Sequence, residues 1–360
     1  MLDHFYRKAL LYTALLISLF LLIACAGPGT ISPTSVTTLA PTEPMAAPTE
    51  EAKPADLGKL VVAFGTTPLD QTAHFFAYAL ENGFYKEQGL EVEFLPLKGD
   101  QNAIRAVVSG DADVAWTGFV ASLQANEAGA DLVAFSGFNP KIDYLLVSKT
   151  EIERPKDIEG HKLGVSGPGA VSHQVPNLMI EADGGDPEKV ELVAVGGSSS
   201  RVQALIAGDI DAAALNYVFS LRTKDYDNLH TIGDAASALP NYLYANEIAD
   251  RKTLEEKADA IQAFVNGTMK AVLWANEPEN FEKAVDISQQ ILPDTPRDEL
   301  AIGLQHFIDI GYWNPSGVLP KEAFDFSQNV ALEFEFLQTP LNYEDYWVGT
   351  FVEEASQVIK

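Results

Sequence analysis

The chain has 360 residues, 47% of them hydrophobic, and a formal net charge of −27. This length allows a sizeable core and predicts two domains. So acidic a protein repels phosphate backbones, which argues against nucleic acid as a partner. The single cysteine, Cys25, excludes an internal disulfide bond and a cysteine metal cluster.

The first 24 residues are predicted to be a lipoprotein signal peptide. Arg7 and Lys8 precede an uncharged, leucine-rich run of 16 residues, 9–24, which is shorter than the ~20 residues that a membrane-spanning helix needs. The run ends in Leu22-Ile23-Ala24-Cys25, which resembles the bacterial lipobox, whose cysteine is acylated and becomes the first residue of the mature protein. We therefore expect Cys25 to be lipidated, with a plain signal peptide or an uncleaved anchor as the alternatives.

Residues 25–58 are predicted to be a tether. Residues 26–58 contain six prolines, eight serines or threonines and few large apolar side chains. Such a segment cannot bury enough surface to offset its ordering entropy. The folded part should begin near Lys59, and the chain should be exported and lipid-anchored to the cell membrane, facing the periplasm or the cell exterior.

From Lys59 onward, short apolar runs alternate with helical patterns. This alternation predicts βαβ units with parallel strands in open α/β sheets. The predicted strands are residues 60–64, 90–94, 114–117, 132–135, 144–147, 162–165, 190–195 and 242–245, the last returning to the first lobe. The predicted helices are residues 74–82, 119–127, 173–181, 253–274, 278–290, 297–310, 321–337 and 346–358, and residues 84–89 and 155–158 are predicted turns.

One helix–turn–strand unit occurs twice, 98 residues apart. Residues 105–115 and 201–213 align on Gly110 and Gly208, and each glycine is followed by Asp-x-Asp and an apolar strand start. A glycine after a helical turn is a C-cap signal, because it adopts the left-handed conformation without a Cβ penalty. The spacing is too wide for a solenoid repeat and fits one unit in each of two similar lobes.

The aspartates of these units are not expected to bind metal. Asp111 and Asp113 belong to one lobe and Asp209 and Asp211 to the other, and aspartate after glycine is ordinary turn chemistry. No H-E-x-x-H, G-x-S-x-G or calcium-loop spacing is present. The sequence therefore predicts no metal site, no cofactor and no catalytic residue.

Four motifs, residues 83–92, 110–115, 163–169 and 208–213, resemble those of extracytoplasmic solute-binding proteins of ABC importers. The first of them reads G-F-Y-K-E-Q-G-L-E-V. The most similar branch of that family binds nitrate, sulfonates, taurine, thiamine-pyrimidine precursors and related vitamins. The resemblance implies an α/β type II periplasmic-binding-protein fold with a hinge and a ligand cleft between two lobes. Lobe 1 would be residues 59–145 plus 240–360, and lobe 2 residues 146–239.

The resemblance also implies a binding protein rather than an enzyme. Such a protein captures a small molecule by lobe closure, as a monomer, and delivers it to a membrane permease driven by an ATPase. One alternative is an enzyme similar to thiamine-pyrimidine synthase, which shares this fold, but that branch carries a cysteine-rich motif and no cysteine follows Cys25 here. A sensor receptor domain of the same fold is the other alternative.

Ligands in open α/β sheets bind at the carboxyl ends of strands, which here selects four loops. The predicted ligand residues after the first strand are Thr66, Thr67, Asp70 and Gln71, with helix capping by Asp70 as the alternative. Those after the first Gly-Asp-x-Asp strand are Trp116, Thr117 and Phe119. A tryptophan there could stack on a planar ligand or lie in the core.

The other two loops lie in the second lobe. Residues 166–173 precede a helix whose first amides would attract a polar or anionic group, and the predicted ligand residues are Ser166, Gly169, Ala170, Val171, Ser172 and His173. Ser172 replaces the third glycine of G-x-G-x-x-G, so dinucleotide binding is poorly supported, and His173 could instead be a capping or packed histidine. Asn216, Tyr217 and, on the return crossing, Tyr242 are the remaining predicted ligand residues, with hinge packing as the alternative.

Aromatic side chains in these loops favour a planar heteroaromatic ligand, such as a thiamine-pyrimidine precursor or a riboflavin-like vitamin. A sulfonate or nitrate would instead require a cation. The loops contain no lysine or arginine, and Arg105 and Arg201 fall within predicted helices, where we expect surface positions. An alkanesulfonate, taurine or nitrate remains the alternative ligand.

Overall fold

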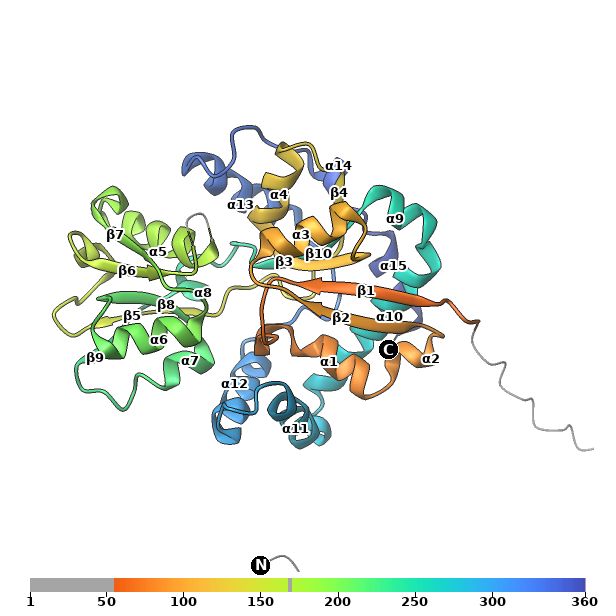
Figure 1. Ribbon diagram of the computed structural model, residues 1–360, viewed down its shortest axis with the longest axis horizontal. Coiled ribbons are helices and arrows are strands. Elements are labelled where there is room, and N and C mark those ends of the chain that lie inside the picture. The colour runs from red at the N-terminus through yellow and green to blue at the C-terminus, as the bar shows by residue number, and fades with distance from the viewer. Residues whose placement is uncertain (1–54, 168–169, 360) are drawn as a thin grey trace, which may run out of the picture. The chain divides into compact units, whose positions relative to one another are not determined.

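The computed structural model describes residues 55–167 and 170–359. The predictions for the signal peptide, for Cys25 and for the tether as far as residue 54 concern residues outside this part. Within it, ten strands form two five-stranded sheets (Figure 1). None of the helices in these ranges combines the length and apolarity needed to cross a membrane.

The first sheet has the strand order β2-β1-β3-β10-β4, built from β1 (Lys59–Phe64), β2 (Glu91–Pro96), β3 (Val114–Gly118), β4 (Leu132–Ser136) and β10 (Ala245–Asp250). β1 pairs in parallel with β2 and β3, as the βαβ pattern predicts. β10 is antiparallel to both β3 and β4. The expectation of parallel strands is therefore wrong for β10, because this strand returns from the second sheet and belongs to no βαβ unit.

The return crossing also begins its strand later than predicted. Residues 242–245 were expected to form it, but β10 starts at Ala245. The amide of Leu243 donates to Ser327 Oγ at 2.7 Å and that of Tyr244 to Pro140 O at 2.9 Å. These donors bind a helix and a loop instead of a strand, so the apolar run fills the core without joining the sheet.

The second sheet has the order β7-β6-β8-β5-β9, with β5 (Tyr144–Lys149), β6 (Lys162–Val165), β7 (Glu191–Ala194), β8 (Ala212–Asn216) and β9 (Leu229–Asp234). β6 is parallel to β7 and β8, whereas β5 is antiparallel to β8 and β9. β9 was not predicted, because its residues form neither an apolar run nor a regular alternation.

Helices cover both faces of the first sheet. On β3, Val114 and Trp116 pack toward α1 and α10, and Ala115 packs toward α3, α4 and α13, as the two-residue period of a strand requires. The helices are α1 (His74–Glu81), α2 (Phe84–Glu87), α3 (Asp100–Ser109), α4 (Phe119–Glu127), α5 (Val171–Ala182), α6 (Ser198–Ala207), α7 (Tyr217–Leu221), α8 (Ala235–Ala238), α9 (Arg251–Glu256), α10 (Ala258–Asn276), α11 (Phe281–Ile291), α12 (Arg297–Asp309), α13 (Lys321–Glu333), α14 (Tyr343–Tyr346) and α15 (Thr350–Val358).

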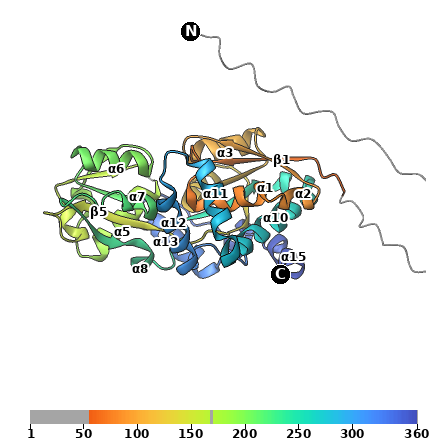
Figure 2. The same cartoon turned by 90° about the horizontal axis from the view of Figure 1, so that it is seen from below.

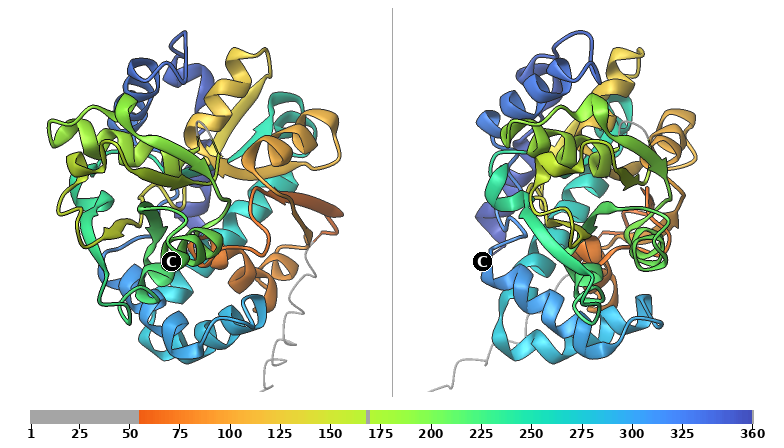
Figure 3. Two further views of the ribbon diagram at one scale, coloured as in Figure 1. Left: turned by 60° about the vertical axis from the view of Figure 1, so that its left-hand side comes forward. Right: turned by 90° about the vertical axis from the view of Figure 1, so that its left-hand side faces the viewer.

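The carboxyl-terminal third is helical, as predicted, with different breaks. The predicted helix 253–274 is split into α9 and α10, because Lys257 leaves the helical conformation with φ −118° and ψ 28°. The helix predicted over residues 346–358 is likewise shorter and begins at Thr350. Figure 2 shows α12 beside α7, and in Figure 3 the blue tail segments flank the first sheet, with α13 near α4 and α11 near α1.

The two Gly-Asp-x-Asp units have the same structure and the same role. Gly110 and Gly208 end α3 and α6 in the left-handed conformation, with φ of 79° and 80°. The second aspartate then holds the start of the neighbouring strand: Asp113 Oδ2 accepts the amide of Val61 and Asp211 Oδ2 that of Lys162, both at 2.9 Å. The carboxylates of Asp113 and Asp211 also pair with lysines, Lys257 and Lys149. These aspartates therefore stabilise the sheets.

Candidate functional site

Three side-chain carboxyl groups lie where the C-terminal ends of β1 and β3 meet β8 and the segments that connect the two sheets. We call Asp70, Asp100 and Asp143 the acidic cluster. The phenol of Tyr244 lies within electrostatic reach of all three, and Asp70 lies within reach of both Asp143 and the guanidinium of Arg201. The hydroxyl of Tyr244 makes no hydrogen bond within the described residues, although the side chain is only 7% exposed.

Each carboxyl group of the acidic cluster has a raised pKa. Burial raises the pKa of Asp70 to about 6, although the charge of Arg201 opposes this. Burial raises the pKa of Asp100 to about 6, although a hydrogen bond from the amide of Gly118 lowers it. Burial raises the pKa of Asp143 to about 7, although hydrogen bonds from Asn216 and Tyr217 lower it. A site with such carboxyls favours groups that donate hydrogen bonds and disfavours anions.

Asp100 was not among the predicted site residues. It begins α3, and its carboxylate lies against the backbone of Gly65, which follows β1, and of Gly118, which ends β3. A Cβ atom at Gly118 would stand 2.9 Å from Asp100 Oδ2, and one at Gly65 would overlap Oδ1. The sequence signal for this close contact is the pair of glycines at the ends of the two strands, since a glycine there allows a side chain to approach the backbone.

Arg201 is buried, which corrects the expected surface position. Only 1% of it is exposed, and Nε donates to Ala214 O at 2.9 Å, Nη1 to Gly196 O at 2.6 Å and Nη2 to Ser198 Oγ at 2.8 Å. The guanidinium also lies over the ring of Tyr144, 5.9 Å from its centroid. The arginine faces inward because polar partners, not apolar ones, surround this side of α6. Arg105 is exposed, as expected.

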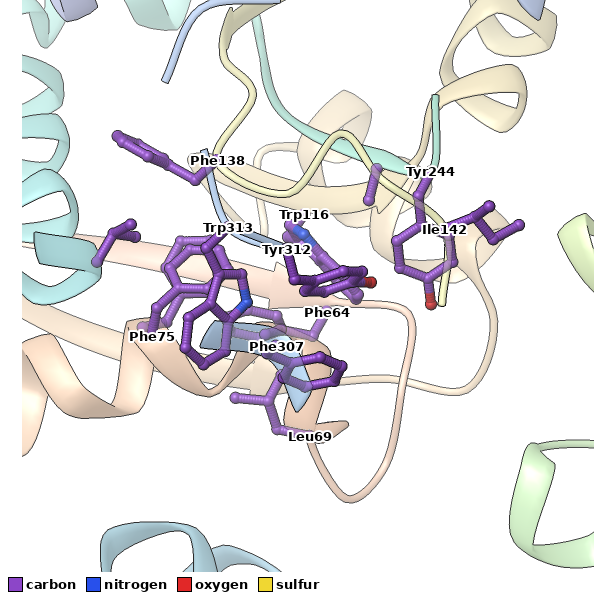
Figure 4. Packing of buried hydrophobic residues seen from close by; sticks show 14 of the residues in the cluster. Phe64, Leu69, Phe75, Trp116, Phe138, Ile142, Tyr244, Phe307, Tyr312 and Trp313 are labelled. Carbon is purple, nitrogen blue, oxygen red and sulfur yellow. The ribbon is translucent and has the colours of Figure 1, made fainter. Parts of the chain in front are cut away.

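Trp116 lies beside the acidic cluster but is packed on all sides. Its Nε1 donates to Asn139 Oδ1 at 3.1 Å, and its ring centroid lies 6.4 Å from that of Phe64 and 6.0 Å from that of Tyr244. Figure 4 shows Trp116 with Tyr312 and Tyr244, and the hydroxyl of Tyr312 points toward Tyr244. Tyr312 comes from the helical tail, which carried no sequence signal for the site.

Thr117 and Phe119 are placed away from this group. Phe119 is fully buried and packs edge-on against Phe324 and Tyr346 on the opposite face of the sheet. Thr117 is buried opposite Asn246 of β10, and its hydroxyl has no partner within the described ranges. These two residues of the second predicted set lie in the core.

In the segment after β1, some polar side-chain atoms form hydrogen bonds within the protein and others do not. Asp70 precedes a short 3-10 helix at Gln71–Ala73 without capping it through its side chain, so the capping alternative is not realised. Thr67 Oγ1 donates to Leu97 O at 3.0 Å, and Gln71 Nε2 donates to Leu300 O at 2.7 Å. Thr66 Oγ1 and Gln71 Oε1 are buried without a hydrogen-bond partner among the described residues, and Gln71 Oε1 lies against the backbone of Gly303.

The loop before α5 is closed on itself. Ser172 Oγ accepts the amide of Ser166 at 2.8 Å and bonds the Ser166 hydroxyl at 2.7 Å. The helix begins at Val171 with Ala170 as N-cap, two residues earlier than predicted, and Gly169 lies outside the described residues. His173 Nε2 hydrogen-bonds Asn177 Nδ2, and its ring packs edge-on against Phe336. His173 is thus a packed histidine here.

The predicted ligand residues at the end of β8 and on the return crossing are held by neighbours. Asn216 Nδ2 donates to Asp143 Oδ1 at 2.7 Å, and Asn216 Oδ1 accepts from Ser198 Oγ at 2.6 Å. The ring of Tyr217 stacks on His306 of α12 at 3.6 Å and 8°. Tyr242 is buried, and its hydroxyl hydrogen-bonds Gln174 Oε1. Asn216 thus fixes Asp143, whereas Tyr217 and Tyr242 bridge elements far apart in the sequence.

Residues 71–280, more than half of the chain, match the model of the family described as NMT1/THI5 like. A formylaminopyrimidine-binding protein of Halalkalibacterium halodurans is 23% identical over 220 residues, which cover 59% of this chain and 65% of the relative, less than two thirds of its length.

Two solved structures share the fold at low identity. The periplasmic nitrate-binding protein of Synechocystis is 13% identical with a TM-score of 0.69, covering 84% of this chain and 89% of that one. The periplasmic aliphatic sulphonate-binding protein of Escherichia coli is 16% identical with a TM-score of 0.65, covering 81% and 92%. They confirm the predicted type II periplasmic-binding-protein fold.

Proposed function

The chain belongs to the NMT1/THI5-like family, and we propose that it is the extracytoplasmic substrate-binding protein of an ABC importer. It would capture a small molecule between its two sheets and pass it, unaltered, to a permease and its ATPase. Lobes at residues 59–145 plus 240–360 and 146–239 would close on the ligand, and the acylated Cys25 would hold the monomeric protein at the membrane. The binding-protein fold of the solved neighbours and the name of the curated relative support this role.

The ligand we propose is a planar heteroaromatic molecule with hydrogen-bond donors, such as an aminopyrimidine or a flavin-like vitamin. The acidic cluster carries this proposal, because its carboxyls, buried at Asp143 and partly buried at Asp70 and Asp100, accept hydrogen-bond donors and repel anions. The nearby cation is Arg201, whose Nε, Nη1 and Nη2 already donate hydrogen bonds to groups of the second sheet, of its connecting loop and of α6. A sulfonate or nitrate would therefore meet carboxyls first. The aromatic groups of Tyr144, Tyr244 and Tyr312 supply faces and edges for a ring.

Native mass spectrometry of the full chain with Cys25→Ser, before and after mild denaturation, tests this function. We expect a co-purifying ring compound that leaves on unfolding with its mass unchanged, or thermal stabilisation by formylaminopyrimidine or riboflavin. Stabilisation by nitrate or alkanesulfonate alone would overturn the ligand class and keep the importer role. Conversion of an added pyrimidine to a product of different mass would overturn the binding role.

Asp70→Asn is expected to weaken formylaminopyrimidine binding about 10- to 100-fold, since a hydrogen bond to a charged acceptor contributes about 1.5–3 kcal/mol. Isothermal titration calorimetry measures the effect. Asp259→Asn, at an exposed position on α10, is the matched control and should bind as the parent does. Equal affinities of Asp70→Asn and its parent would remove Asp70 from the ligand contacts.

A further inference from the structure

Helix α12 of the tail contacts helix α7, which begins at Tyr217, along one face. Glu299, Gly303 and His306 are spaced i, i+4 and i+7, which places them in one row on the helix. Glu299 Oε2 pairs with Arg222 Nε at 3.1 Å, and His306 stacks on Tyr217. Arg222 also donates from Nη2 to Thr295 Oγ1 at 3.2 Å, just before the helix. We call this contact the α7–α12 seam.

Gly303, in the middle of the row, is the point of closest approach. A Cβ atom there would overlap Val218 Cγ2 of α7 and Gln71 Oε1. A glycine in a helix interior costs about 1 kcal/mol relative to alanine, so the position needs a packing reason. The reason here is that α7 lies directly against the backbone of α12.

The same helix face reaches the ligand loop of the other sheet. Gln71 Nε2 donates to the carbonyl of Leu300, one turn from Gly303. The amide of Tyr217 is meanwhile directed to Asp143 Oδ2 at 3.3 Å. α12 therefore contacts the segment after β1 and helix α7 after β8 at once, and both adjoin the acidic cluster.

We infer that α12 is a positioning element for the ligand site, in which Gly303 and His306 hold α7, with Tyr217, against the short helix that begins at Gln71 when the two sheets close. This inference rests on the proposed function for the identity of the ligand, but the seam itself is a property of the chain. Tyr217 then acts as a wall fixed by His306 rather than as a free ring clamping the ligand. Loss of the seam should speed ligand release more than it slows capture, because changes at one interface act mostly on the dissociation rate.

A test that needs no ligand uses a Cys25→Ser chain, so that two introduced cysteines are the only cysteines present. We expect the pair Val218→Cys and Gly303→Cys to form a disulfide under mild oxidation, because the two side chains would be in contact. The pair Val218→Cys and Ile302→Cys is the matched control, since Ile302 is 48% exposed on another face of α12. Absence of the first disulfide in a folded chain, or equal formation of both, would overturn the seam.

A kinetic test uses formylaminopyrimidine as the probe and stopped-flow fluorescence as the readout. His306→Ala should raise its dissociation rate about three- to tenfold, with a smaller change in the association rate, and His306→Phe should restore the parent rate by keeping the stack. A dissociation rate unchanged in His306→Ala, or not restored in His306→Phe, would overturn the inference. If the disulfide forms but no ring compound binds, the proposed function fails while the seam stands.

Discussion

Replacing Arg201 with methionine is expected to lower the free energy of unfolding by about 3–5 kcal/mol, because three hydrogen-bonding groups lose their donor at about 1–3 kcal/mol each. The guanidinium is buried, and it satisfies the carbonyls of Gly196 and Ala214 and the hydroxyl of Ser198. Methionine fills a similar volume but leaves these groups without a donor inside the protein. It also removes the positive charge that lowers the pKa of Asp70, so that carboxyl becomes harder to ionise. Urea unfolding followed by circular dichroism measures the change.

Arg105→Met is the matched control for this substitution. Arg105 belongs to the other copy of the repeated unit and is exposed on α3, so its replacement should change the free energy of unfolding by about 0.5 kcal/mol or less. Arg201→Lys should lower the free energy of unfolding by an intermediate amount, because lysine keeps the charge but lacks the planar set of donors of a guanidinium. Equal effects of Arg201→Met and Arg105→Met would mean that Arg201 lies at the surface.

The location of Arg201 shows where hydrophobic periodicity fails. Val202, Leu205 and Ile206 define the apolar stripe of the predicted helix, and Val202 and Leu205 are buried as expected. A buried arginine leaves no apolar signal, because its partners are the backbone carbonyls of Gly196 and Ala214 and the hydroxyl of Ser198 on its own helix. Strands 60–64 and 162–165 and the two glycine caps were predictable because their signals are local.

The rule that ligands bind at the C-terminal ends of strands selected the site loops, but it could not predict which of their side chains face the site. Adjacent residues of a strand face opposite sides, so Trp116 and Thr117 could never both line one site. Asp100 begins α3 and Asp143 lies in a connection, and neither position had a predicted role, while Tyr312 and His306 come from the helical tail, which contains none of the four motifs. Their convergence depends on the packing of α12, which no local pattern encodes.

Replacing Glu247 with glutamine is expected to raise the free energy of unfolding by about 2–3 kcal/mol at pH 8 and to leave it nearly unchanged at pH 4. Glu247 is fully buried on β10, between Trp116 of β3 and Ser136 of β4. Burial raises its pKa from 4.5 to about 7, and the hydroxyl of Ser136 and the amide of Phe138 only partly oppose this. Glutamine has the same shape without a charge to desolvate.

The sign of the pH dependence follows from this raised pKa. Below about pH 4.5 the carboxyl is protonated in both the folded and the unfolded chain, so it costs no stability. Between pH 4.5 and 7 the unfolded chain ionises first, and stability falls progressively as the pH rises. Above pH 7 the full cost is present, and Glu247→Gln removes it. Glu279→Gln, at an exposed position, is the control and should show no such pH dependence. A Glu247→Gln chain that is less stable than its parent at pH 8 would mean that the carboxylate has a cationic partner in the folded state.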